Sequence, residues 1–148
     1  EIDAIVAIEQ KADFKPYSDL AVPGKEIVQT ARLVATARLA DAQGDLPGAA
    51  RAYEEAITIE DALAYMEPPY WYYPIRQSLG SIYLRQGKLD AAEKALRDSL
   101  VRVRSNGWAL AGLAEVYKRK GDAKSEALAR KAYERAWLGS SAPDIDRL

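Results

Sequence analysis

The side chains able to carry chemistry here are carboxylates, lysines and arginines, because the 148 residues include neither histidine nor cysteine. The commonest general base and the strongest thiol nucleophile are therefore missing, and no cysteine can hold zinc or form a disulfide. Two adjacent acidic pairs, Glu54-Glu55 and Glu60-Asp61, fall in helix-like sequence, where neighbouring side chains point in different directions. We expect no catalytic residue, no metal and no cofactor.

Cations and one tryptophan offer binding chemistry instead. Arg85, Lys118 and Arg119 could attract an acidic segment or a carboxylate, and Trp108 would add stacking area. Counting from the glycine turns described below predicts a concave face with eight candidate partner contacts: Arg38, Gln77, Ser81, Arg85, Trp108, Glu115, Lys118 and Arg119. For any single one of them, the alternative is a side chain that is merely solvated.

A second group of residues is interpreted as structural. Arg76 occupies a predicted interhelix position, and Glu60, Asp61 or Glu67 could supply its carboxylate partner. Aromatic residues surround two adjacent prolines in the sequence from 65 to 73. We expect Trp71 and Tyr73 to anchor this insertion on neighbouring helices, and an exposed aromatic platform is the alternative. Asn106 is the expected N-cap of the helix that carries Trp108, with Ser105 as the other option.

Three glycine-centred turns organise the elements that carry these residues. Gly44, Gly87 and Gly121 each separate two apolar helical segments, and the last two lie 34 residues apart. Tyr83 and Tyr117 keep the same spacing. This is the period of the tetratricopeptide repeat, a helix-turn-helix unit that stacks into a right-handed superhelix. The pattern predicts an all-α solenoid with about three helix pairs and a leading helix.

The boundaries of this single predicted domain follow from the turns and the prolines. A leading helix and loop take residues 1–21, and the aromatic insertion takes residues 65–72. The three predicted repeats cover residues 22–64, 73–104 and 105–138. Residues 139–148 are expected to form a loosely held tail.

A more specific resemblance rests on three stretches: Glu60 to Pro74, Arg76 to Gly80, and Asn106 to Leu113. On these stretches, residues from about 22 to 148 resemble a group of bacterial tetratricopeptide proteins, and look like the C-terminal portion of longer repeat proteins. The resemblance implies an interaction domain and no chemical activity. The residues with which some tetratricopeptide domains clamp a C-terminal carboxylate are not matched, so recognition of a chaperone C-terminus is not expected.

Composition narrows the class of partner. Lysines and arginines number 21 against 22 acidic residues, a net charge of −1 without a basic stripe, so we expect no nucleic acid. No apolar run approaches the ~20 residues of a membrane span, and no membrane partner is expected. The chain starts at Glu1, which suggests an excerpt or a processed form. The compartment stays open, and a cytoplasmic location is favoured.

We therefore expect a non-catalytic scaffold that presents a concave groove to a protein or peptide, with an acidic segment as one option. Two alternatives come from other classes. One is a sensor of a small molecule or metabolite, with a pocket formed by Trp108, Arg85 and the aromatic loop. The other is a structural spacer or self-association unit within a larger repeat protein.

Overall fold

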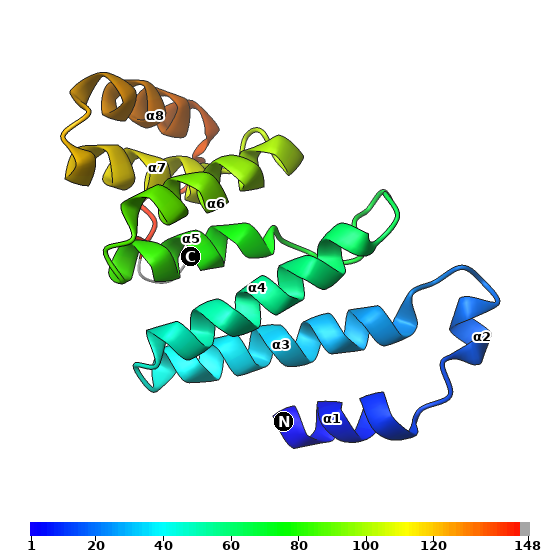
Figure 1. Cartoon of the computed structure of the whole chain (residues 1–148). Helices are drawn as coiled ribbons and strands as arrows, with labels where there is room; N and C mark the ends of the chain where they lie inside the picture. Colours follow the sequence, from blue (N-terminus) through cyan, green and yellow to red (C-terminus); the bar gives the residue numbers. More distant parts are fainter. Residues whose placement is uncertain (146–148) are drawn as a thin grey trace. The chain divides into compact units, whose positions relative to one another are not determined.

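The computed structural model describes residues 1–145, and the regular secondary structure in this range consists of eight α-helices without a strand (Figure 1). The all-α prediction is thereby confirmed at the level of class. The helices are α1 (Ile2–Lys11), α2 (Lys15–Ser18), α3 (Gly24–Ala42), α4 (Leu46–Ala62), α5 (Ile75–Arg85), α6 (Leu89–Arg102), α7 (Gly107–Lys120) and α8 (Ala123–Ala136). They divide between two compact units, Glu1–Tyr73 and Pro74–Leu148, which are described separately. Within the described residues, no helix combines the length and apolar character that crossing a membrane requires.

The first unit is built on the α3–α4 hairpin, with α1 packed along α3 (Figure 1). Val34 and Ala37 of α3 are buried, as are Tyr53 and Ala56 of α4, so small and large side chains alternate across the contact. Polar contacts join α1 to α3. Arg32 Nε of α3 donates to Glu9 Oε2 of α1 at 2.6 Å, and Gln29 Nε2 donates to Glu9 Oε1 at 3.0 Å.

The second unit consists of two successive hairpins, α5–α6 and α7–α8, and α7 packs against both α5 and α6. Leu84, Leu96, Leu113 and Val116 form its buried core with several alanines. Gly80 makes the α5–α6 contact close, because a Cβ built at this residue would lie 2.5 Å from Leu96 Cγ.

The three predicted glycine turns are confirmed and share one geometry. Gly44, Gly87 and Gly121 have φ values of 80°, 73° and 73°, in the left-handed region where a side chain is strained. After each glycine, the next backbone N–H donates to the carbonyl five residues back, as from Asp122 to Tyr117 at 3.0 Å. This is the Schellman pattern of a helix end.

The element boundaries differ from the predicted ones in two informative places. The break before residue 22 contains a short helix, α2, because Pro16 lies in its first turn, where a missing N–H costs nothing. The helices α4, α6 and α8 each end about two residues before the predicted boundary, and the closing residue is extended or irregular. Helix ends commonly fray by this amount.

Candidate functional site

Part of the predicted contact set forms a charged group at the C-terminal end of α7. Glu115 Oε1 accepts from Arg119 Nε at 2.7 Å, and Glu115 Oε2 lies 3.7 Å from Lys118 Nζ. The hydrogen bond from Arg119 is the main reason that the pKa of Glu115 lies below its usual value, with Lys118 adding to it. Arg119 Nη1 also donates to the Leu84 carbonyl at the end of α5, at 3.1 Å. Arg119 therefore joins the two first helices of the hairpins while its side chain stays 44% exposed.

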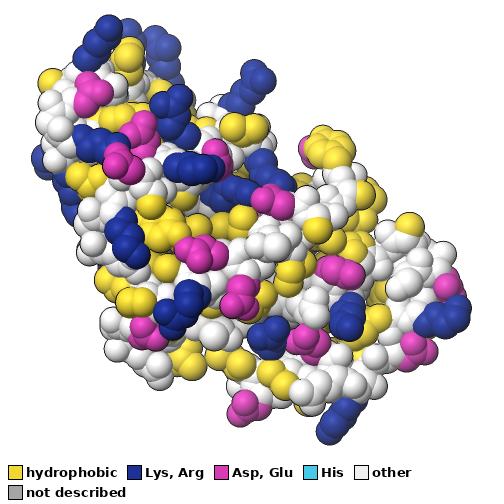
Figure 2. All heavy atoms as spheres, viewed as in Figure 1, with side chains coloured by type: hydrophobic (Ala, Val, Ile, Leu, Met, Phe, Trp, Pro, Cys, Tyr) yellow, Lys and Arg dark blue, Asp and Glu magenta, His cyan; other side chains and the backbone are white. Residues whose placement is uncertain are grey.

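Figure 2 shows lysine and arginine side chains gathered over the α7–α8 hairpin. The residue count agrees with the picture. The second unit has 15 basic and 9 acidic residues, a net charge of +6, whereas the first has 6 basic and 13 acidic residues, a net charge of −7. The net charge of the whole chain is only −1, which is why no polyanion partner was expected from the sequence. The opposite charges of the two units can be counted only when the boundary after residue 73 is known.

Two predicted contact residues, Gln77 and Ser81, are buried within the second unit. The Gln77 side chain accepts at Oε1 from Asn106 Nδ2, at 2.7 Å. Asn106 Oδ1 accepts from the Ala109 backbone N–H at 3.3 Å, so the predicted N-cap is confirmed. Gln77 and Asn106 are only 8% and 7% exposed, and their amides serve the connection between α5 and α7. Ser81, 2% exposed, is the other buried member of the predicted set.

Trp108 is half-buried and packs edge-on against Trp137, with ring centroids 5.0 Å apart. Trp137 also contacts Tyr133 and lies against Gly107, where an added Cβ would meet its ring at 2.9 Å. The Trp108 ring thus has an internal packing partner, which leaves less of it for a ligand. Arg85, near the end of α5, is half-buried and has interactions within the chain.

The segment that follows α8, residues 139–145, makes contacts that the sequence did not predict. Ser81 Oγ donates to the Ile145 carbonyl at 2.6 Å, and the Ile145 side chain packs on the core of the second unit. Trp137 Nε1 donates to the Ser141 carbonyl at 2.7 Å. Ser141 and Ile145 of the predicted loosely held tail thus make contacts within the second unit, and residues 146–148 lie outside the described range. Only the branched apolar Ile145 hinted at packing in a segment without helical periodicity.

A further polar network joins α6 to α7 and was also missed. Lys120 Nζ donates to Asp90 Oδ1 at 2.5 Å and to Glu93 Oε2 at 2.6 Å, and Tyr117 donates to Glu93 Oε1 at 3.1 Å. These hydrogen bonds raise the pKa of Lys120 to about 12 and lower the pKa of both carboxyls. The partners are 27 and 30 residues apart, so sequence spacing alone gives no signal for them.

In the first unit, the aromatic insertion contacts α3. The Arg38 guanidinium lies 5.6 Å from the centre of the Tyr73 ring, within cation–π range. Trp71, Tyr72 and Tyr73 touch one another, with ring centroids from 4.9 to 6.3 Å apart, and Tyr72 is 73% exposed. The Tyr73 contact agrees with an anchoring role, while Tyr72 presents an open aromatic face.

The predicted partners of Arg76 have several contacts of their own. Tyr65 donates its hydroxyl proton to Glu67, and this hydrogen bond raises the pKa of Tyr65. Glu60, Asp61 and Arg76 all take part in interactions within the chain. The ion pair between Arg76 and one of these carboxylates stays a prediction.

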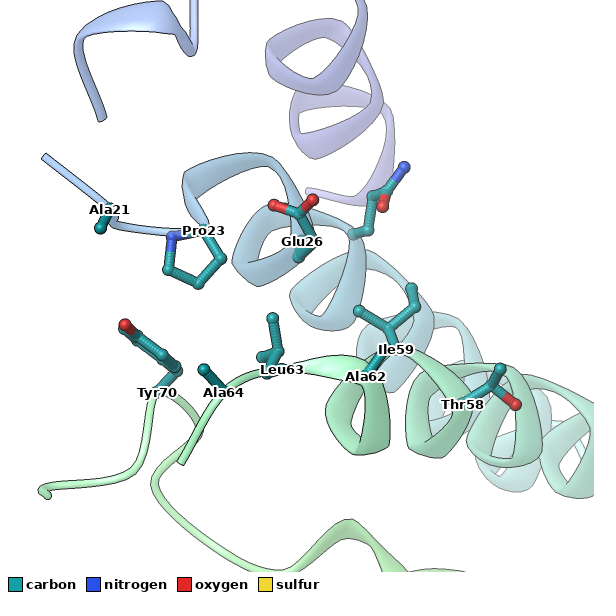
Figure 3. A pocket seen from close by; sticks show the side chains of 10 residues that line it. Ala21, Pro23, Glu26, Thr58, Ile59, Ala62, Leu63, Ala64 and Tyr70 are labelled. Carbon is teal, nitrogen blue, oxygen red and sulfur yellow. The ribbon is translucent and has the colours of Figure 1, made fainter. Parts of the chain in front are cut away.

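A cavity of about 500 Å³ opens in the first unit between the start of α3 and the end of α4 (Figure 3). Pro23 and Glu26 border it on the α3 side, Ile59 and Leu63 on the α4 side, and Tyr70 of the aromatic insertion closes one edge. Its walls are mostly apolar, with the Glu26 carboxylate as the charged group. None of the eight predicted contact residues lines this cavity.

Among residues 1–145, no group of three or more acidic side chains is placed to hold a metal ion. Comparison with family models, with curated proteins and with solved structures gives no match for this chain.

Proposed function

We propose that the chain is a non-catalytic protein-binding unit of the tetratricopeptide type, and that its second unit carries the binding surface. The observation that supports this most is the repetition within that unit. The hairpins α5–α6 and α7–α8 contain the same glycine turn 34 residues apart, and their first helices, α5 and α7, pack together. Stacked hairpins of this length present successive helices side by side, as binding scaffolds do.

Charge supports an acidic partner for this surface. The second unit has a net charge of +6, and Lys118 at the end of α7 has a side chain that is 62% exposed. Glu115 balances only part of the charge of Lys118 and Arg119. Positive fields of this kind speed encounter with acidic surfaces and favour them over basic ones. The partner is therefore a protein or peptide with an acidic segment.

Affinity capture from host lysate at low salt tests this proposal. The native chain is compared with a Lys118→Glu, Arg119→Gln variant, in which the α7 end loses three units of positive charge. The matched control is Lys15→Glu, Lys25→Gln, which makes the same change on exposed residues of the first unit. Circular dichroism confirms that all three chains are equally helical.

The proposal predicts proteins that the native chain and the control retain and that the α7 variant loses. Equal recovery by all three chains would contradict the placement of the binding surface. Recovery of no specific protein would contradict the binding role itself and return attention to the sensor and spacer alternatives.

A further inference from the structure

The surface predicted to contact a partner already holds a peptide segment, and that segment belongs to this chain. Ser81 was predicted as a partner contact on the first helix of its repeat. In the structure its hydroxyl donates to the Ile145 carbonyl at 2.6 Å. We call residues 139–145 the post-α8 segment. Through Ile145 this segment contacts α5, although Ser81 and Ile145 are 64 positions apart in the sequence.

The contact combines a polar and an apolar part. The Ile145 side chain packs on a buried cluster to which α5 contributes Leu84 and α7 contributes Leu113. Ser81 is 2% exposed while the segment is in place, and its hydroxyl donates to the Ile145 carbonyl. An occupant that covered Ser81 without an acceptor would leave this hydroxyl unpaired, which is costly, so the site favours an occupant that supplies a carbonyl at this point.

The post-α8 segment also shows which chemistry the site accepts. Residues 141–144 are not helical, and Pro143 restricts the backbone just before the contact. The occupant is a Pro-Asp-Ile segment, in which the proline lowers the entropy lost on binding.

We propose that the α5–α7 surface is a binding site for short peptides in which a branched apolar residue follows a proline-containing non-helical stretch, and that the post-α8 segment occupies it in cis through Ile145. This inference rests on the proposed protein-binding function and names its ligand class. An attached segment acts at a high effective concentration, so a separate peptide must displace it. Partner binding is then coupled to release of the post-α8 segment.

The probe is a fluorescein-labelled peptide with the sequence of residues 139–145, and its binding to the full chain is followed by fluorescence polarisation. The Ile145→Asp chain loses the apolar anchor of its own segment. We expect it to bind the peptide at least tenfold more tightly than the native chain. Ala142→Asp is the matched control, because it adds the same charge at an exposed position of the segment, and it should bind the peptide like the native chain.

Two further variants test whether the peptide occupies the same site. Adding Ser81→Ala to Ile145→Asp removes one hydrogen-bond donor and should weaken peptide binding about fivefold. Ile145→Ala removes the anchor without adding charge, and we expect it to bind several-fold more tightly than the native chain. If Ile145→Asp lowers the helical circular dichroism signal, Ile145→Ala replaces it in the comparison of peptide affinities.

Equal affinity of the native and Ile145→Ala chains, or no binding by either, would overturn the proposal, as would equal binding of a scrambled peptide. The assay contains no host protein. A failed capture experiment with a successful peptide titration would therefore reject only the proposed acidic protein partner, and the reverse result would reject only occupancy by the post-α8 segment.

Discussion

At the scale of single residues, the stability of the second unit depends on positions where a single added or removed side-chain group disturbs the packing. Gly80 faces Leu96, which is fully buried between α5 and its neighbours. A methyl group at residue 80 would overlap Leu96 Cγ and Cδ2 at 2.5 and 2.6 Å. Because the surrounding core is close-packed, the leucine has little room to move.

Gly80→Ala is therefore expected to lower the free energy of unfolding by about 1–3 kcal/mol, although alanine is the better helix former. Urea denaturation measures this. The same substitution in a Leu96→Ala background should cost much less or even stabilise by up to about 1 kcal/mol, since the overlap is gone and helix propensity remains. An equal cost in both backgrounds would show that Leu96 is not the obstacle.

Asn106 makes a second prediction at this scale. Asn106→Ala removes the cap on Ala109 and leaves the buried Gln77 carbonyl without a donor, so we expect a loss of about 2–4 kcal/mol in unfolding free energy. Asn106→Ser keeps a capping oxygen and should lose less. Ser105→Ala, at the exposed neighbouring position, should change the value by less than about 0.5 kcal/mol. Similar losses for Asn106→Ala and Ser105→Ala would contradict the cap assignment.

At the scale of elements, α6 and α7 are joined by ionisable groups as well as by the apolar core. Lys120 has a folded-state pKa of about 12, above its usual value, so its contribution is complete below about pH 10.4 and is lost as pH rises toward 12. Glu93 and Asp90 have lowered pKa values. Their contribution is present above about pH 4.3 and is lost as pH falls through their folded-state pKa values.

Lys120→Met should consequently lower the urea midpoint at neutral pH, and the difference from the native chain should shrink below pH 4 as the carboxyls become protonated. Lys131→Met is the matched control at an exposed position of α8, and it should leave the midpoint nearly unchanged at every pH. A difference between the native and Lys120→Met chains that stays constant from pH 7 to pH 3 would mean that Lys120 acts through packing, not through these ion pairs.

The sequence predicted the elements well where a local rule decides the structure. The left-handed turns at Gly44, Gly87 and Gly121 and the cap at Asn106 are set by residues only a few positions apart. Features that depend on distant contacts were not predictable. The burial of Ser81 and the docking of Ile145 join residues 64 apart, and neither composition nor periodicity records such a pair.

At the scale of the whole molecule, charge is divided unequally between the two units. The acidic unit, with a net charge of −7, contains the cavity beside Tyr70, and the basic unit, with a net charge of +6, contains the paired hairpins and the occupied α5–α7 surface. Low salt strengthens the attraction of the basic unit for an acidic partner, because exposed charges are screened within about 10 Å at 0.1 M ionic strength. This charge supports the proposed binding role of the second unit.

Lysine cross-linking in host lysate, read by mass spectrometry, tests this assignment most directly, because the lysines of each unit serve as controls for the other. The account predicts that cross-links to other proteins fall on Lys118, Lys124 and Lys131 of the basic unit and become rarer as salt is raised. Cross-links concentrated on Lys11, Lys15 and Lys25 of the acidic unit, or spread evenly over both units, would contradict it.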